Sequence, residues 1–162
     1  MDKQMAFDLA IGMCEKSNVG YDVNHSEHQI RTLIGSAAVF VDIGGSDEQL
    51  SYHLWASFVH DIELTDATEW GALRWVNRKN HENWYGRYIL VERDEDGRRK
   101  GTLVVENEIL VADIQQSEFI NALTMLWAHA NNADDEAVEL FGGKTAAEVI
   151  AEQRAGSDAE NV

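Results

Sequence analysis

Hydrophobic and polar positions divide this chain into segments with helical or strand spacing. Apolar residues recur every three to four positions from Asp2 to Ser17, which predicts a first helix that ends near Asn18 to Gly20. Residues 29–43 are rich in β-branched and aliphatic side chains and pause at Gly35-Ser36, so two strands are expected there. The sequence Gly44-Gly45-Ser46-Asp47 then predicts a turn.

The most regular alternation lies between Leu50 and Ile62 and predicts a long strand. One expected face is apolar enough for the core: Tyr52, Leu54, Ala56, Phe58 and His60. The other face mixes aromatic, aliphatic and polar side chains: His53, Trp55, Ser57, Val59 and Asp61. A mixed face is typical of a sheet surface partly covered by a helix, and it is also a candidate binding surface.

A capped helix is predicted after this strand. Thr65 and Asp66 offer side-chain oxygens to the free amides of the first turn, and Glu69 completes a capping-box pattern with Asp66. At 3.6 residues per turn, one expected apolar stripe also carries two asparagines: Trp70, Leu73, Val76, Asn77 and Asn80. Because buried amides need hydrogen-bond partners, the side chains of both asparagines are expected to form hydrogen bonds to main-chain groups where the helix ends.

The next segment predicts a β-hairpin. A strand is expected from Trp84 to Glu92 and a return strand at residues 102–106. Between them, Asp94-Glu95-Asp96-Gly97 ends in the Asp-Gly pair that tight hairpin turns favour. The three basic residues at 98–100 lie close to several acids, so local charge compensation is expected there rather than a nucleic-acid patch.

Helices are predicted for the last third of the chain. Ser117 is a candidate cap for a helix whose apolar face comprises Phe119, Leu123, Leu126, Trp127 and Ala130. Asn131-Asn132 is expected to interrupt this helix, and a short second helix is expected to end at Gly142-Gly143. One or two further amphipathic turns are expected after Lys144.

Together these elements predict an α+β fold, with an antiparallel sheet of about five strands and helices packed mainly on one face. Residues 1–155 are expected to form a single domain, which by its length buries about two-thirds of its unfolded surface. Residues 156–162 are small and polar, and a disordered acidic tail is expected there.

The chain has 29 acidic and 13 basic residues and a formal net charge of −16. This charge repels phosphate backbones and anionic lipids, so it argues against nucleic-acid and membrane partners and favours a basic or amphipathic polypeptide. Solubility alone is an equally ordinary explanation for the acidity. A lone cysteine, Cys14, and the lack of a signal peptide or membrane-length apolar run favour a soluble cytoplasmic protein.

Little in the sequence predicts catalysis, a cofactor or a metal. No phosphate-binding loop, nucleophile elbow or paired-cysteine zinc pattern is present. His25, Glu27 and His28 are three potential ligands without a fourth, which is more typical of a polar loop than of a metal site. The best catalytic candidates are His53, His60 and Asp61. Seven positions separate the two histidines, so a regular strand would place them on opposite faces, which argues against an enzyme.

Residues 65–91 are the most specific part of the sequence. The helix end with Asn77 and Asn80 is followed by Gly86 and Arg87 at a strand start, by the charged hairpin 94–99, and by a last helical region at 119–143. This arrangement resembles the YbjN family and related actinobacterial proteins, which share the fold of type III secretion chaperones (CesT-like). The resemblance spans residues 28–143 and rests on the order and spacing of these pieces.

The resemblance implies a small acidic adaptor or peptide-binding chaperone that holds a polypeptide segment against its sheet and helices. The candidate peptide-binding residues are Trp55, Val59, Trp70 and Trp84. A homodimer is expected because chaperones of this fold usually pair, and because five tryptophans exceed what one small core readily absorbs. The alternatives are a structural subunit of a larger assembly and, less favoured, an enzyme.

Overall fold

The computed structural model describes residues 1–34, 37–46 and 49–159. Within these ranges the helices are α1 (Lys3–Lys16), α2 (Asp66–Glu82), α3 (Gln116–Phe141) and α4 (Ala146–Ala159). The strands are β1 (Tyr21–Asn24), β2 (Gln29–Ile34), β3 (Ala37–Ser46), β4 (Gln49–Glu63), β5 (Arg87–Glu95), β6 (Arg98–Leu110) and β7 (Lys144–Thr145). Every strand pair is antiparallel. The predicted α+β class is confirmed, and the described residues form a sheet of seven strands rather than about five.

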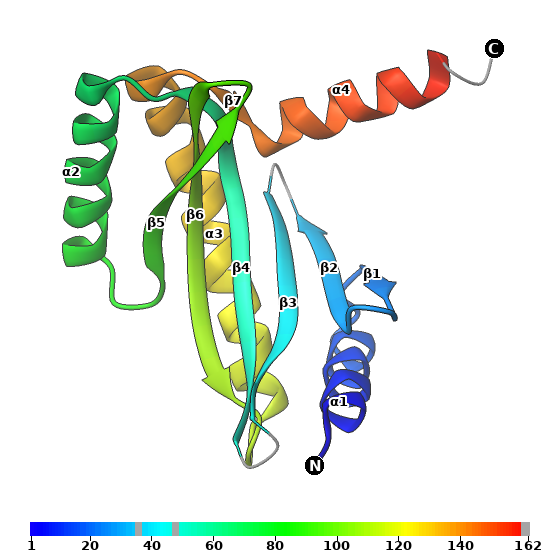
Figure 1. Ribbon diagram of the computed structural model, residues 1–162. Helices are drawn as coiled ribbons and strands as arrows, with labels where there is room; N and C mark the ends of the chain where they lie inside the picture. Colours follow the sequence, from blue (N-terminus) through cyan, green and yellow to red (C-terminus); the bar gives the residue numbers. More distant parts are fainter. Residues whose placement is uncertain (35–36, 47–48, 160–162) are drawn as a thin grey trace.

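The strands form one sheet in the order β1-β2-β3-β4-β6-β5, and β7 pairs with the end of β4. The long helix α3 crosses the back of the sheet in Figure 1, with α2 beside β5 and α1 below β2. Helix α4 projects from the upper end of the sheet beyond β7. In this view no described helix lies in front of the middle of β4, β6 and β5, so one face of the sheet is open there.

The core lies between the sheet and α3, because alternate residues of each strand point to the same side. Its largest fully buried side chains include Tyr52, Leu54, Phe58, Leu103, Val39 and Val41 from the strands and Phe7, Phe119, Leu123 and Leu126 from the helices. The apolar face predicted for β4 is therefore confirmed from Tyr52 to Phe58. The hydroxyl of Tyr52 donates a hydrogen bond to the carbonyl of Ala6, 2.8 Å away, which ties α1 to the sheet.

The predicted apolar stripe of α2 is wrong, because the helix is rotated about its axis. Ala72, Trp75 and Val76 are the buried residues, while Trp70 and Asn77 are exposed. Trp75 explains the rotation. Its ring packs against the rings of Phe58, Tyr88 and Phe141, and its indole N–H donates to the Glu136 carboxylate of α3 at 3.1 Å. A large side chain with that many partners decides the phase of the helix.

The side chain of Asn80 forms hydrogen bonds to main-chain groups as expected, but these groups belong to the neighbouring strand β5 and not to the end of α2. Its side-chain amide donates to the carbonyl of Tyr88 at 2.8 Å, and its side-chain oxygen accepts from the N–H of Tyr88 at 2.6 Å. Asn80 thus satisfies both main-chain groups of one residue on the outer edge of β5. Asn77 is exposed, so its expected structural role is not found, and Asn83 instead donates to the carbonyl of Lys79 in the last turn.

The hairpin of β5 and β6 has the turn that its sequence predicts. Asp96 and Gly97 both have positive φ angles, of 52° and 76°, as a two-residue turn of the primed type requires. The strands differ in extent from the prediction, because β5 begins at Arg87 and β6 continues to Leu110. The predicted charge compensation is also found, since Arg99 pairs with Glu92 and with acids of α2.

Two predicted breaks in the C-terminal third differ from the structure. Helix α3 runs without interruption through Asn131-Asn132, and Ser117 is not its cap, because the N-cap residue is Gln115. The predicted stop at Gly142-Gly143 is confirmed, with positive φ angles of 73° and 89°. Helix α4 then continues to Ala159, past the expected boundary at residue 155, and the last three residues lie outside the described part.

The N-terminal helix is found where it was expected, with Asp2 as its N-cap. The region after it contains the short strand β1, which the sequence reading missed, and β3 continues through Gly44 to Ser46 where a turn was expected. Gly35-Ser36 and Asp47 lie outside the described residues. No helix of the described chain has the length and hydrophobicity needed to span a membrane.

Candidate functional site

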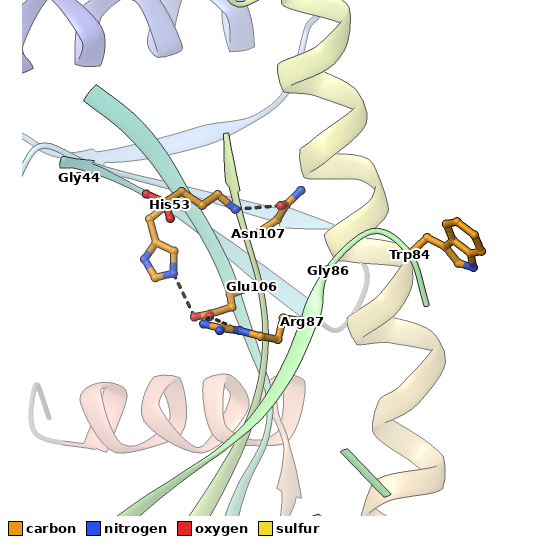
Figure 2. Close-up of a pocket in the computed structure, with 8 residues that line it drawn as sticks. Gly44, His53, Trp84, Gly86, Arg87, Glu106 and Asn107 are labelled. Atoms are coloured by element: carbon orange, nitrogen blue, oxygen red, sulfur yellow. Dashed lines mark hydrogen bonds and ion pairs between the residues drawn. The ribbon is translucent and has the colours of Figure 1, made fainter. Parts of the chain in front are cut away.

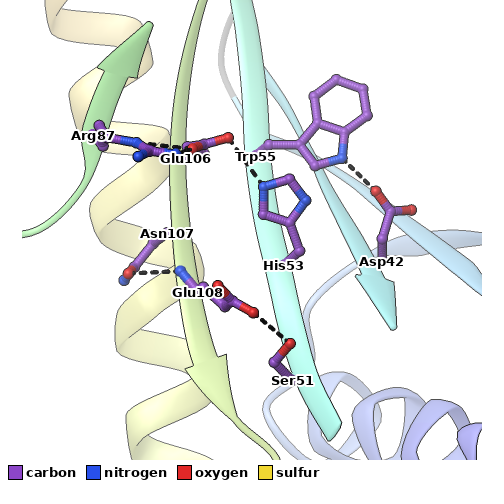
Figure 3. A network of polar contacts seen from close by, with 8 residues as sticks. All are labelled: Asp42, Ser51, His53, Trp55, Arg87, Glu106, Asn107 and Glu108. Carbon is purple, nitrogen blue, oxygen red and sulfur yellow. Dashed lines mark hydrogen bonds and ion pairs between the residues drawn. The ribbon is translucent and has the colours of Figure 1, made fainter. Parts of the chain in front are cut away.

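The open face of the sheet carries two rows of side chains across neighbouring strands. In one row the register aligns Phe40, Trp55, Glu106 and Arg87 from β3, β4, β6 and β5. In the adjacent row it aligns Asp42, His53 and Glu108. Figure 3 shows how several of these side chains meet across the strands. A surface of this composition, built from four neighbouring strands, is the strongest candidate site in the described chain.

Trp55 is held in a fixed orientation on this face. Its ring stacks on Phe40 with 4.3 Å between ring centroids and an angle of 16° between planes. Its indole N–H donates to Oδ2 of Asp42 at 2.6 Å, and Oδ1 of Asp42 accepts from the amide of Gln29 at 2.8 Å. A half-buried tryptophan fixed by stacking and by a charged hydrogen bond offers a pre-organised contact surface at little entropic cost.

Glu106 links three strands on the open face. Its carboxylate pairs with the Arg87 guanidinium of β5 and lies 3.1 Å from Nε2 of His53 on β4 (Figures 2 and 3). Partial burial would raise the pKa of Glu106, but the hydrogen bonds from Arg87 and His53 outweigh this effect and lower it. The carboxylate therefore stays charged near neutral pH, and its contact with a permanent cation is typical of a structural ion pair.

A groove of about 450 Å³ lies beside these rows, and the term groove is used only for this hollow from here on. Its floor is formed by Thr102, Val104 and Glu106 of β6, and its walls are His53, Trp55, Ser57 and His60 of β4 and Ile89, Val91 and Arg93 of β5. The middle of the groove is mainly apolar and its two ends are charged. Apolar grooves with a few polar groups at fixed positions are typical of binding sites for small molecules and peptides.

An irregularity in β4 brings both histidines to the groove. The register of β4 against β6 shifts between Ser57 and Val59 and again between Val59 and Ile62, so the two-residue alternation of faces is lost. His53 and His60 consequently line the same groove, which corrects the prediction that they face opposite sides. Burial lowers the pKa of His60, and the nearby Asp61 only partly offsets this effect. Asp61 itself pairs with Arg93 rather than orienting a histidine.

The predicted peptide-binding residues do not all lie together. Trp55 lines the groove, but Val59 is fully buried where β7 pairs with β4 and is not available to a ligand. Trp70 is 64% exposed on the outer side of α2, in a different part of the molecule from the groove. Trp84 is 99% exposed in the loop after α2. It lines a second recess that shares His53 and Glu106 with the groove, although its ring points away from the other residues drawn in Figure 2.

The whole groove lies inside a region that matches a known family. Residues 12–149 match the model of the family described as T3SS (YopN, CesT) and YbjN peptide-binding chaperone 1, where T3SS denotes the type III secretion system. The chain belongs to this family. A search of curated proteins finds no match.

The fold of this peptide-binding chaperone family is also found among solved structures. The crystal structure of YbjN from E. coli aligns with this chain with a TM-score of 0.59. That protein is described as a candidate transcription regulator. The alignment covers 85% of this chain and 96% of the YbjN chain at 11% sequence identity. This likeness supports the fold, and the expected resemblance to YbjN and to type III secretion chaperones is confirmed.

Gly86 and Arg87, which carry part of the resemblance, position the start of β5. Gly86 has a φ angle of 137°, and a Cβ atom added there would lie 3.2 Å from the side chain of Val105. Glycine therefore allows the chain to turn closely over β6, and Arg87 then reaches Glu106. Sequence reasoning missed Glu106, Val104 and Ile89 as parts of the site, although they occupy alternate positions of the predicted hairpin strands.

The two histidines near the N-terminus have structural contacts. The rings of His25 and His28 pack edge-on against Phe7, and Nε2 of His28 lies 3.0 Å from the side-chain oxygen of Gln4. Among the described residues no group of three or more histidine, cysteine, aspartate or glutamate side chains is arranged to hold a metal ion.

Proposed function

We propose that this chain is a non-enzymatic, chaperone-like adaptor that binds a polypeptide segment in the groove. The observation that carries the proposal is the apolar middle of the groove, where Trp55, Ile89 and Val104 lie on a sheet face with no described helix over it. Membership of a family described as peptide-binding chaperones supports a polypeptide as the ligand. The net charge of −16 favours a partner segment that contains basic residues.

The groove is a better candidate than the edges of the sheet. A peptide that added a strand to β5 would need the outward main-chain groups of that strand. At Tyr88 these groups are already bonded to Asn80, and helix α2 packs beside β5. The opposite edge is β1, which has only four residues. Short or occupied edges disfavour strand addition, whereas the groove requires no main-chain group of the sheet to be free.

A basic amphipathic peptide is expected to bind with an affinity that falls, but does not vanish, as salt rises. Between about 0.01 M and about 1 M salt the screening length falls from about 30 Å to about 3 Å, which removes the long-range attraction and leaves the apolar contact. Fluorescence anisotropy of labelled peptides would measure this. The control peptide keeps the apolar residues and has glutamate in place of lysine. No saturable binding of any basic amphipathic peptide at low salt would contradict the proposal.

We also propose that two copies of the chain pair through the outer side of α2. Trp70 and Leu73 are exposed there, three positions apart on the helix, and pairing would remove both from water. Light scattering is then expected to give twice the 18.2 kDa mass of one chain, and Trp70→Glu is expected to shift the protein towards the monomer. A monomer mass across a wide concentration range would contradict pairing without affecting the peptide proposal.

A further inference from the structure

We infer that the bound segment carries a basic residue an even number of positions from its apolar residues. This inference rests on the proposed function and adds the chemistry of the ligand. It follows from the distribution of charge along the groove, where one end has the larger excess of carboxylates and the carboxylates at the other end are each paired with a cation.

The floor of the groove fixes the spacing. Thr102, Val104 and Glu106 of β6 line the groove, and Glu108 follows in the same alternation towards a second recess. Successive residues on one face of a strand are about 7 Å apart. An extended ligand lying along β6 has the same repeat. A side chain two or four positions from the residue over Val104 would therefore point down beside Glu106 or Glu108.

The end of the groove near His53 has an excess of negative charge. The second recess, of about 780 Å³, is lined by Glu106 and Glu108 and has Arg87 as the one fixed cation among its described lining residues. Asp42 lies directly across from His53, and among the described residues its carboxylate accepts side-chain hydrogen bonds only from the uncharged Gln29 and Trp55. Three carboxylates against one guanidinium leave a local charge of about −2.

The other end of the groove is closer to balance, because Asp61, Glu95 and Glu63 face the two cations Arg93 and Lys100, a local charge of about −1. Arg93 pairs with Asp61 and lies 3.3 Å from Glu95, and Lys100 pairs with Glu63. The hydrogen bond from Lys100 also lowers the pKa of Glu63, which keeps this pair charged. A basic side chain gains little there, because the carboxylates already have cations. A basic side chain of the ligand is therefore expected at the end near Glu108. Among the side-chain hydrogen bonds of the described residues, the Glu108 carboxylate accepts only one, from the Ser51 hydroxyl at 2.6 Å.

The test uses short peptides with three apolar residues at alternating positions, separated by serine, and a single lysine. The lysine is placed two, three or four positions beyond the first or the last apolar residue, so that both chain directions are tested. At low salt we expect the even spacings at one end to bind about twofold to fivefold more tightly than the three-residue spacing, which points the lysine away from the sheet. Calorimetry or anisotropy would measure the affinities.

Glu108→Gln identifies the carboxylate. This change keeps the shape of the side chain and removes its charge, so the preference for even spacing is expected to shrink. Glu139→Gln is the matched control, because it makes the same change in charge at an exposed site on α3, behind the sheet. Peptides that bind equally well at every lysine position would overturn this inference and leave the proposed function intact. Failure of every peptide to bind would overturn both.

Discussion

Asn80→Ala is expected to lower the free energy of unfolding by about 2 to 3 kcal/mol, one of the larger effects available in this chain. The side chain of Asn80 makes two hydrogen bonds to the backbone of Tyr88, which is buried. Truncation removes both partners and leaves a main-chain donor and acceptor at the edge of β5 to be satisfied by water or not at all. For a chain of this size the melting temperature should fall by about 5 to 10 °C.

Asn77→Ala is the matched control for this prediction. It removes the same atoms from the same helix, three residues earlier, at an exposed position. Alanine is also the better helix former, so the free energy of unfolding should change by less than about 0.5 kcal/mol. Thermal and denaturant unfolding followed by circular dichroism would measure both variants. Equal losses at the two positions, or no loss at Asn80, would show that the bonds to Tyr88 are not what stabilises this edge.

The contrast between the two asparagines shows what sequence pattern can and cannot determine. Caps, spacing and the Asp96-Gly97 turn depend on neighbouring residues, so the helix start at Thr65 and the hairpin were predictable. The rotation of α2 depends on Trp75 and on Glu136, which is 61 residues away in the sequence. Periodicity alone allowed a stripe that begins at Trp70, and only the tertiary contacts of Trp75 determine that the helix buries a different face.

The irregularity of β4 was hidden for the same reason. The alternation of residues 50–62 predicts a regular strand, and it correctly identifies the buried side of its first half. The register shifts near Val59 arise where β4 exchanges β3 for β7 as its neighbour, and β7 comes from a segment more than 80 residues later. No pattern within β4 indicates that His60 turns to the same side as His53.

Part of the groove could have been found from the sequence. The mixed face of β4 pointed to Trp55, and the alternation of the hairpin strands contained the signal for Ile89 and Val104. Which side of the hairpin would join the open face depends on the order β4-β6-β5, a fact of topology that the sequence pattern does not contain. Trp70 shows the opposite limit, because the sequence pattern does not indicate that this exposed tryptophan lies on α2, away from the groove.

Trp55→Ala is expected to weaken peptide binding by about thirtyfold, which corresponds to the loss of about 2 kcal/mol that is typical when a central aromatic contact is truncated. The indole forms a wall of the groove and is already fixed by Phe40 and Asp42, so a ligand gains its contact area without ordering it. Isothermal calorimetry is the appropriate measurement, because it does not rely on the fluorescence of the tryptophan that is removed.

Trp70→Ala is the matched control, since it truncates a tryptophan of the surface proposed for pairing and not of the groove, and the affinity per chain should stay within about twofold of that of the unchanged chain. A second groove variant guards against a folding defect in Trp55→Ala. Val91→Lys adds a charge at a groove residue that is already exposed, and it should also weaken the binding of a basic peptide, whereas Met125→Lys on α3 should not. If Trp70→Ala weakens binding and both groove variants bind normally, the ligand contacts α2 and the groove is not the binding site.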